Sequence, residues 1–135
     1  MLQRINYYVL TFKNYRMSYF EKTKDLYNQI YSGQLMNAFE QYYHPEVKRV
    51  EASGEVCEGK DANRVREAQF VASIKEIHGG GINGISANEE EGITMVDSWM
   101  DVSFQDGNRM KLEQVAVQRW QDDQIINERF YYHSH

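Results

Sequence analysis

Two carboxylates and an arginine are the residues of this 135-residue chain that we expect to act on a small molecule. Glu51 lies near the end of an expected strand and, placed among aromatic side chains, would have the raised pKa that suits a general base. Asp97 and Arg129 are expected to flank Ala116 in one row of a sheet, where the small alanine leaves space between them. An ion pair there would leave Arg129 with free donors for a carbonyl or carboxylate group. These residues predict binding or proton transfer, with Glu51 and Asp97 as candidate catalytic residues.

The register of two hairpins should position these side chains. Asp106-Gly107 is typical of a two-residue type I′ turn, because both central residues of that turn need positive φ. A second turn is expected at Asp122-Asp123. With these turns, opposed residues share a face, and one face combines aromatic and polar side chains like the wall of a ligand pocket. This wall comprises Met95, Asp97, Trp99, Asp101, Met110, Leu112, Gln114, Gln118, Trp120, Asn127, Arg129 and Tyr131, with Tyr42 from a preceding helix close to it.

Each of these residues also has a structural interpretation. A buried Asp–Arg pair often only holds a sheet together, and Glu51 could lie at an exposed strand end. The amides of the wall could satisfy one another across the strands, and Trp99 and Trp120 could be core aromatics that border the pocket. Both interpretations stay open at the level of sequence.

Composition and charge exclude several classes of protein. The chain is 41% hydrophobic and 26% charged, which is ordinary for a globular domain, and its net charge of −5 comes without a Lys/Arg cluster, so we expect no nucleic-acid partner. No apolar run is long enough for a membrane span, and we expect no membrane partner. Cys57 is the single cysteine, which favours a reducing, cytoplasmic location. The histidines His44, His133 and His135 lack ligand spacing, so we expect no metal and no cofactor.

The order of elements predicts an α+β fold with helices on one face of an antiparallel sheet. Residues 17–135 form a single domain, and residues 1–16 are expected to be an extension before a natural start at Met17, or else an added edge strand. Helical spacing of apolar residues and turn signals predict three helices and two short strands ahead of the hairpins. The expected helices run from Ser18 to Gly33, over Leu35–Tyr43 and over Lys60–His78, where Gly79–Gly81 end the last one, and the expected strands are Val47–Ala52 and Ile82–Ala87.

The second face of the two hairpins is expected to be strongly apolar. A face of that kind would not stay in water on a monomer, so we predict a homodimer through it, with Glu113, Arg119 and Glu128 paired across the interface. The alternative is that the N-terminal segment covers this face within one chain. The expected face comprises Val96, Met100, Val102, Phe104, Val115, Val117, Ile126, Phe130 and Tyr132.

Several short motifs resemble the SnoaL-like group of the nuclear-transport-factor-2-like superfamily. They are Ser32–Phe39, Tyr42–Pro45 leading into a strand, Glu58–Asp61, and Val117–Trp120 ahead of the last strand, and the resemblance spans nearly all of residues 18–132. The resemblance implies a curved sheet wrapped around a long helix, forming a cone with an open apolar pocket, and a dimer. The superfamily includes ketosteroid isomerases, polyketide cyclases, dehydratases and non-catalytic binding modules, so the fold alone does not assign the function.

The known chemistries of this superfamily map onto the chain only in part. The position of the isomerase general base is matched by Glu51, whereas the positions of its two oxyanion donors fall near Leu26 and at Ala116, which cannot donate, although Tyr27 is one residue away from the first. In the last strand, the positions of the cyclase histidine and acidic base hold Arg129 and Tyr131. Three interpretations therefore remain: a cofactor-free isomerase or lyase, a non-catalytic pocket for a small apolar or carbonyl- or carboxylate-bearing molecule, and a protein-interaction module.

Overall fold

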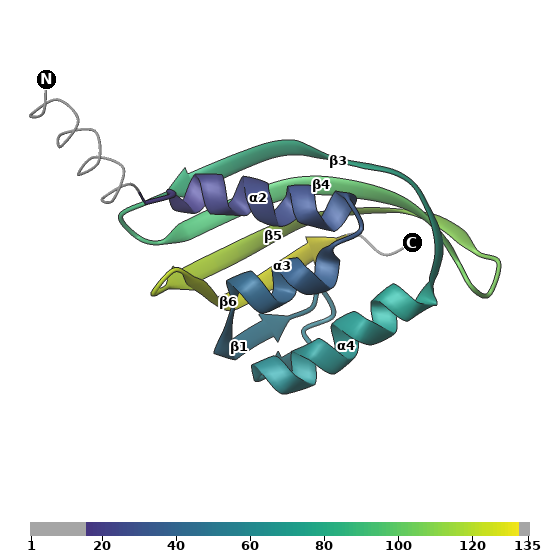
Figure 1. Ribbon diagram of the computed structural model, residues 1–135, viewed down its shortest axis with the longest axis horizontal. Helices are drawn as coiled ribbons and strands as arrows, with labels where there is room; N and C mark the ends of the chain where they lie inside the picture. The colour runs from purple at the N-terminus through teal and green to yellow at the C-terminus, as the bar shows by residue number, and fades with distance from the viewer. Residues whose placement is uncertain (1–15, 133–135) are drawn as a thin grey trace, which may run out of the picture.

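A curved six-stranded sheet with three helices on one face frames the molecule (Figure 1). The structure is a computed structural model that describes residues 16–132, so the expected extension, residues 1–16, lies outside the described residues except for Arg16. The elements in chain order are α2 (Tyr19–Tyr31), α3 (Leu35–Tyr42), β1 (Tyr43–Val50), β2 (Val56–Glu58), α4 (Lys60–Ser73), β3 (Ile74–Asn88), β4 (Ile93–Phe104), β5 (Arg109–Gln121) and β6 (Gln124–Tyr132).

The sheet has the order β2-β1-β6-β5-β4-β3. Strand β1 runs parallel to β6, whereas the other neighbouring strands are antiparallel, so the sheet is mixed rather than wholly antiparallel. Helix α2 packs on β3 and β4, α3 on β6, and α4 on β1 (Figure 1). The expected α+β class, with helices on one face of a curved sheet, is confirmed. Among the described residues, no helix is long and apolar enough to cross a membrane.

Helix α2 begins with a well-formed N-terminal cap. The Ser18 hydroxyl accepts a hydrogen bond from the Glu21 backbone N–H at 3.1 Å, and the Glu21 carboxylate accepts one from the Ser18 backbone N–H, which is a capping box. Glu89, from the turn between β3 and β4, accepts hydrogen bonds at 2.9 Å from each of the first two backbone N–H groups of the helix. The helix ends before Gly33, whose φ of +82° suits glycine.

The third helix is shorter than its spacing predicts. Helix α4 ends at Ser73, and the expected continuation to His78 is wrong because Ile74 already pairs with Phe104 of β4. The glycine run therefore lies inside strand β3, where it gives space to aromatic rings rather than ending a helix. A Cβ on Gly80 would lie 2.6 Å from the Tyr31 ring, so only glycine fits there.

The register of the β4–β5 hairpin differs by one residue from the prediction. Phe104 N donates to Asn108 O at 2.8 Å, which leaves a three-residue loop, and only Gly107 of that loop has positive φ. This is the geometry of a type I turn with a glycine bulge rather than a type I′ turn. Asp97 consequently lies opposite Val115 instead of Ala116. A slip of one residue exchanges the faces of one strand relative to its neighbour, and here β4 is the strand whose predicted faces are reversed, whereas Gln118 and Trp120 of β5 point inward as predicted.

The second hairpin keeps its predicted turn but not its full register. Asp122 and Asp123 both have positive φ, as a type I′ turn requires, and Trp120 lies opposite Ile125 as expected. An irregularity between Arg119 and Trp120 then shifts the pairing, so that further along the strand Gln118 faces Glu128. A single extra residue of this kind is a β-bulge, and it turns Glu128 toward the helices.

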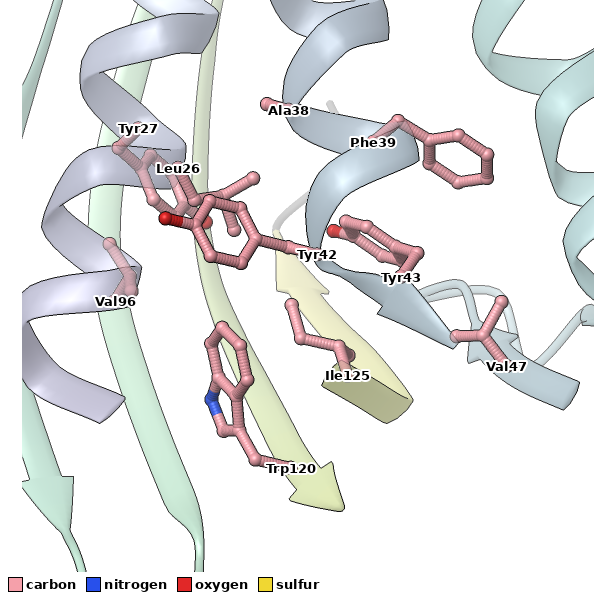
Figure 2. Packing of buried hydrophobic residues seen from close by; sticks show 10 residues of the cluster. All are labelled: Leu26, Tyr27, Ala38, Phe39, Tyr42, Tyr43, Val47, Val96, Trp120 and Ile125. Atoms are coloured by element: carbon pink, nitrogen blue, oxygen red, sulfur yellow. The ribbon is translucent and has the colours of Figure 1, made fainter. Parts of the chain in front are cut away.

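The hydrophobic core lies between the helices and the concave face of the sheet (Figure 2). Tyr42 and Trp120 meet edge to face with ring centroids 5.9 Å apart, and Phe39 stacks on Tyr43 at 4.8 Å. The predicted apolar outer face is wrong in its main members, because the shifted register turns several of them inward. Val96, Val102 and Phe130 are buried, and the large apolar residues exposed on the other face of β4, β5 and β6 are Met95, Val115 and Tyr131.

Candidate functional site

A cavity of about 510 Å³ opens between the helices and the concave face of the sheet. Its walls are mainly aromatic and aliphatic, and its charged side chains come from the end of β1, from α4, and from β5 and β6. A volume of this size suits a small organic molecule. The lining residues are Leu26, Tyr27, Ile30, Tyr31, Leu35, Phe39, Tyr43, Arg49, Glu51, Arg66, Glu67, Phe70, Trp99, Met100, Met110, Lys111, Leu112, Glu113, Gln114, Glu128, Phe130 and Tyr132.

Glu128 of β6 is the centre of a buried polar cluster at one end of this cavity. Its Oε1 accepts hydrogen bonds from the Tyr43 hydroxyl at 2.6 Å and from Arg49 Nε at 3.0 Å, and its Oε2 accepts one from Gln118 Nε2 at 2.9 Å. The side chain is only 2% exposed, so these three donors replace the water that the carboxylate has lost. Glu67 of α4 holds the other side of Arg49 through Nη1.

The cluster extends into the core through Gln118. The Gln118 oxygen accepts a hydrogen bond from the Thr94 hydroxyl at 2.8 Å, and Thr94 accepts one at the same distance from Trp120 Nε1. Every member of this chain is buried. Because each donor has a defined acceptor, the chain fixes the orientation of the Gln118 amide, which in turn fixes Glu128.

Arg49 is held by rings as well as by carboxylates. Its guanidinium carbon lies 5.4 Å from the centroid of the Tyr43 ring and 5.0 Å from that of the Phe130 ring. The neighbouring carboxylates Glu128 and Glu67 outweigh the effect of burial and raise the pKa of Arg49, so it stays charged. Nη2 has no hydrogen-bond partner among residues 16–132. Arg49 can therefore donate to a bound oxygen without giving up its present contacts.

Glu51 follows β1 two residues after Arg49, and it also lines the cavity. Burial raises the pKa of the Glu51 carboxyl, Arg49 and Arg66 lower it, and Glu128 and Glu67 raise it. The net direction is upward. A partly desolvated carboxylate with a raised pKa is a better proton acceptor than an exposed one.

The tyrosines of the site remain neutral hydrogen-bonding groups. Burial, reinforced by the charge of Glu128, raises the pKa of both Tyr27 and Tyr43 far above the usual range. Charged groups around the cavity nearly balance, with four carboxylates and three cations. These are Glu51, Glu67, Glu113 and Glu128 against Arg49, Arg66 and Lys111.

The structure brings only some of the predicted site residues together. Glu51, Gln114 and Trp99 line the cavity, and Gln118 lies directly behind Glu128. Trp120 and Tyr42 are buried in the core, where Tyr42 donates a hydrogen bond to Asp25, so neither lines the cavity (Figure 2).

The remaining predicted residues lie away from the cavity because of the register difference. Asp97 is exposed and accepts a hydrogen bond from Asn83 at 3.3 Å, and the predicted pairing of Asp97 and Arg129 across Ala116 is wrong. Asp101 pairs with Arg109 instead of lining the pocket. The other two members of this group are Asn127 and Tyr131, which alternate with the inward-facing Glu128 and Phe130.

Sequence reasoning missed Arg49, Glu67, Tyr43 and Glu128. Arg49 could have been predicted from the sequence, because residues two apart on a strand share a face and Glu51 was already a candidate. Glu128 could not be assigned to the pocket, since the β-bulge that turns it inward has no clear signal in the sequence. Within the described ranges, no group of three His, Cys, Asp or Glu residues could hold a metal ion.

Comparisons with known proteins agree with this architecture. A family model for the SnoaL-like domain matches residues 17–132. Among solved structures, a proposed SnoaL-like polyketide cyclase from Mesorhizobium loti is 27% identical, with a TM-score of 0.74 over 86% of this chain and 100% of that one. A proposed polyketide cyclase from Pseudomonas putida (16% identity, TM-score 0.76, 87% and 93% covered) and a proposed isomerase from Bacillus subtilis (14%, 0.72, 87% and 90%) share the fold. No curated protein gives a significant match.

Proposed function

This chain belongs to the SnoaL-like family, and from that membership we propose that its cavity binds a small, uncharged, largely apolar molecule that carries a carbonyl group. We further propose that Glu51 moves a proton on this molecule without a cofactor. The observation that supports the proposal most is the pairing of a spare arginine donor with a partly buried carboxylate on one edge of an aromatic cavity.

The charge around the cavity favours an uncharged ligand. Arg49 is already matched by Glu128 and Glu67, and carboxylates slightly outnumber cations on the walls. A carboxylate ligand would therefore enter a site without a free positive charge, at the cost of its hydration. A carbonyl oxygen needs only hydrogen-bond donors, which Arg49 Nη2 can supply.

The proposed reaction is proton transfer next to the carbonyl group. Glu51 in its ionised form takes a proton from the carbon beside the carbonyl, and the C–H electron pair moves to form the enolate. Negative charge then develops on the oxygen that accepts hydrogen bonds from Arg49, where it is stabilised more strongly than the neutral carbonyl. Neutral Glu51 returns the proton to a different carbon in an isomerisation, or the enolate expels a leaving group in an elimination.

Proton exchange with solvent tests this proposal without knowledge of the natural substrate. Phenyl ketones in D₂O are expected to exchange their α-protons faster with the protein than with buffer alone, as followed by NMR. Loss of a general base typically lowers the rate by about 10²–10⁴-fold, and Glu51→Gln should show a loss in that range. Glu58→Gln is the matched control, because Glu58 is exposed on β2 and does not line the cavity. Equal exchange by both variants would remove Glu51 from the mechanism.

Non-catalytic binding is the alternative. It is supported by the residues at the two positions where ketosteroid isomerases have their oxyanion donors. Leu26 and Ala116, which resemble those positions, are buried and apolar, so neither can donate a hydrogen bond to the oxygen. Saturable binding of ketones without any exchange above buffer would favour this alternative over the enzyme.

The apolar side chains on the outer face of the sheet also support a proposal about self-association. We propose a homodimer through the convex face of β4, β5 and β6, where Met95, Val115 and Tyr131 expose apolar surface. Light scattering should give the mass of two chains for the wild type and of one chain for Tyr131→Glu, with Val65→Glu on α4 as the control. A mass unaffected by Tyr131→Glu would rule out this interface. The single, buried Cys57 is the basis for keeping a cytoplasmic location in the proposal.

A further inference from the structure

A second hollow of about 240 Å³, here called the annex, lies next to the main cavity and shares Ile30, Leu35 and Met100 with its lining. We propose that the annex receives an extended apolar tail of the ligand whose carbonyl-bearing part occupies the main cavity. The preferred ligands would then be amphiphiles with a compact polar head and an unbranched hydrocarbon chain. This inference rests on the proposed function, because the head must first occupy the main cavity.

The annex has a different chemical character from the main cavity. Its lining contains no charged side chain among the described residues, whereas the main cavity carries seven. Val71 at the end of α4 is 41% exposed and Ile77 of β3 is 39% exposed, so apolar surface in the annex contacts water. A hydrocarbon chain would cover that surface, and each methylene group that leaves water strengthens binding.

The size of the annex argues for part of a ligand rather than a separate one. Pockets that hold whole drug-sized molecules usually measure about 300–1,000 Å³, and the annex is smaller. The annex lining includes the amides of Gln34 and Asn37 but no charged group among the described residues, and the adjoining main cavity supplies the charged groups that could anchor a head.

The shared wall between the two spaces can adapt to a chain. Leu35 is the first residue of α3, Ile30 lies in the last turn of α2, and Met100 projects from β4. All three are partly buried and aliphatic, and the unbranched thioether of Met100 adopts new rotamers easily. These three side chains form no ion pair, so a methylene chain that contacts them breaks none.

A series of phenyl n-alkyl ketones tests the proposal by isothermal titration calorimetry. In the wild type, the dissociation constant should stay level for the shortest chains, fall about fourfold for each methylene that enters the annex, and level off when it is full. Val71→Trp should fill the annex and abolish the dependence on chain length, while the shortest ketone binds as before. Val65→Trp is the matched control, since Val65 is an exposed valine of the same helix that lines neither space.

Ile77→Trp provides a second block from strand β3 in case Val71→Trp does not fold. If short ketones bind and each methylene gives the same gain in affinity in the wild type and in both blocked variants, the annex does not bind the tail. The proposed function of the main cavity would still stand. Absence of binding for every ketone would overturn both. A change of oligomeric state in the blocked variants, with the chain-length dependence retained, would indicate that the annex contacts a second copy and would also overturn the proposal.

Discussion

Replacing Glu128 by glutamine tests whether one buried carboxylate organises the polar end of the cavity. The Glu128 oxygens accept hydrogen bonds from Tyr43, Arg49 and Gln118, and the side chain is 2% exposed. Glutamine has nearly the same shape but only one acceptor oxygen, and its NH₂ group would point at one of these donors. At least one buried donor would then lose its acceptor.

Neighbouring residues cannot easily correct this mismatch. A flip of the Gln118 amide would take its oxygen away from the Thr94 hydroxyl, which already accepts from Trp120. Breaking a buried ion pair by removing one partner costs roughly 3–5 kcal/mol, and because Arg49 keeps Glu67 we expect the lower end, about 3 kcal/mol. For a domain of this size, that loss lowers Tm by about 10 °C.

Urea unfolding followed by circular dichroism, at a fixed protein concentration, measures this loss of stability. Glu40→Gln is the control, since Glu40 also pairs with an arginine, Arg64, but its side chain is 47% exposed and solvent screens the pair, so the loss should be much smaller. The double variant Arg49→Met/Glu128→Leu should lose less than the sum of its single variants, because neither charge is left alone. If Glu128→Gln loses no more stability than Glu40→Gln, the buried cluster does not have the structural role described above.

Three further variants test separate parts of the structure by the same unfolding assay. Since the pKa of Glu51 is raised in the fold, its ionised form costs stability above that pKa, so Glu51→Gln should be more stable than the wild type at neutral pH, with the gain vanishing as the pH falls through the carboxyl range. An unchanged difference at all pH values would contradict the raised pKa. Gly80→Ala should lose about 1–3 kcal/mol because its Cβ meets the Tyr31 ring, whereas Gly84→Ala, with nothing within 4 Å, should lose less, and equal losses would count against the steric explanation. Glu89→Ala removes the acceptor for two N–H groups at the start of α2 and should cost about 1 kcal/mol; no loss would mean that water replaces this cap fully.

The sequence was sufficient for features that depend on local chemistry. The fold class follows from the order of helical and strand patterns, and the turn at Asp122-Asp123 has the positive φ values expected of it. The end of α2 at Gly33 is likewise a local property of glycine. Each of these predictions needs only a few neighbouring residues, which explains why they hold.

Register was harder to predict because two turn geometries fit the same residues. Gly107 has positive φ in a two-residue and in a three-residue loop, so the Asp-Gly pair does not distinguish them. Apolar side chains also occur on both faces of β4, where Met95 neighbours Val96 and Trp99 neighbours Met100, so alternation does not choose a face. The helix expected to reach His78 failed for a related reason, because pairing with β4 outweighs the helical spacing of the residues that follow Ser73.

The register difference also changes the chemistry that the cavity can support. In the predicted register, the arginine of the site would have been Arg129, with donors free to bind an anion. In the structure, the cation is Arg49, and the inward turn of Glu128 neutralises it together with Glu67. Burial raises the pKa of the Glu51 carboxyl and the carboxylates Glu128 and Glu67 add to this effect, whereas Arg49 and Arg66 act in the opposite direction. The buried cluster therefore places a hydrogen-bond donor and a carboxylate with a raised pKa at one strand edge, with the charge of the arginine already matched.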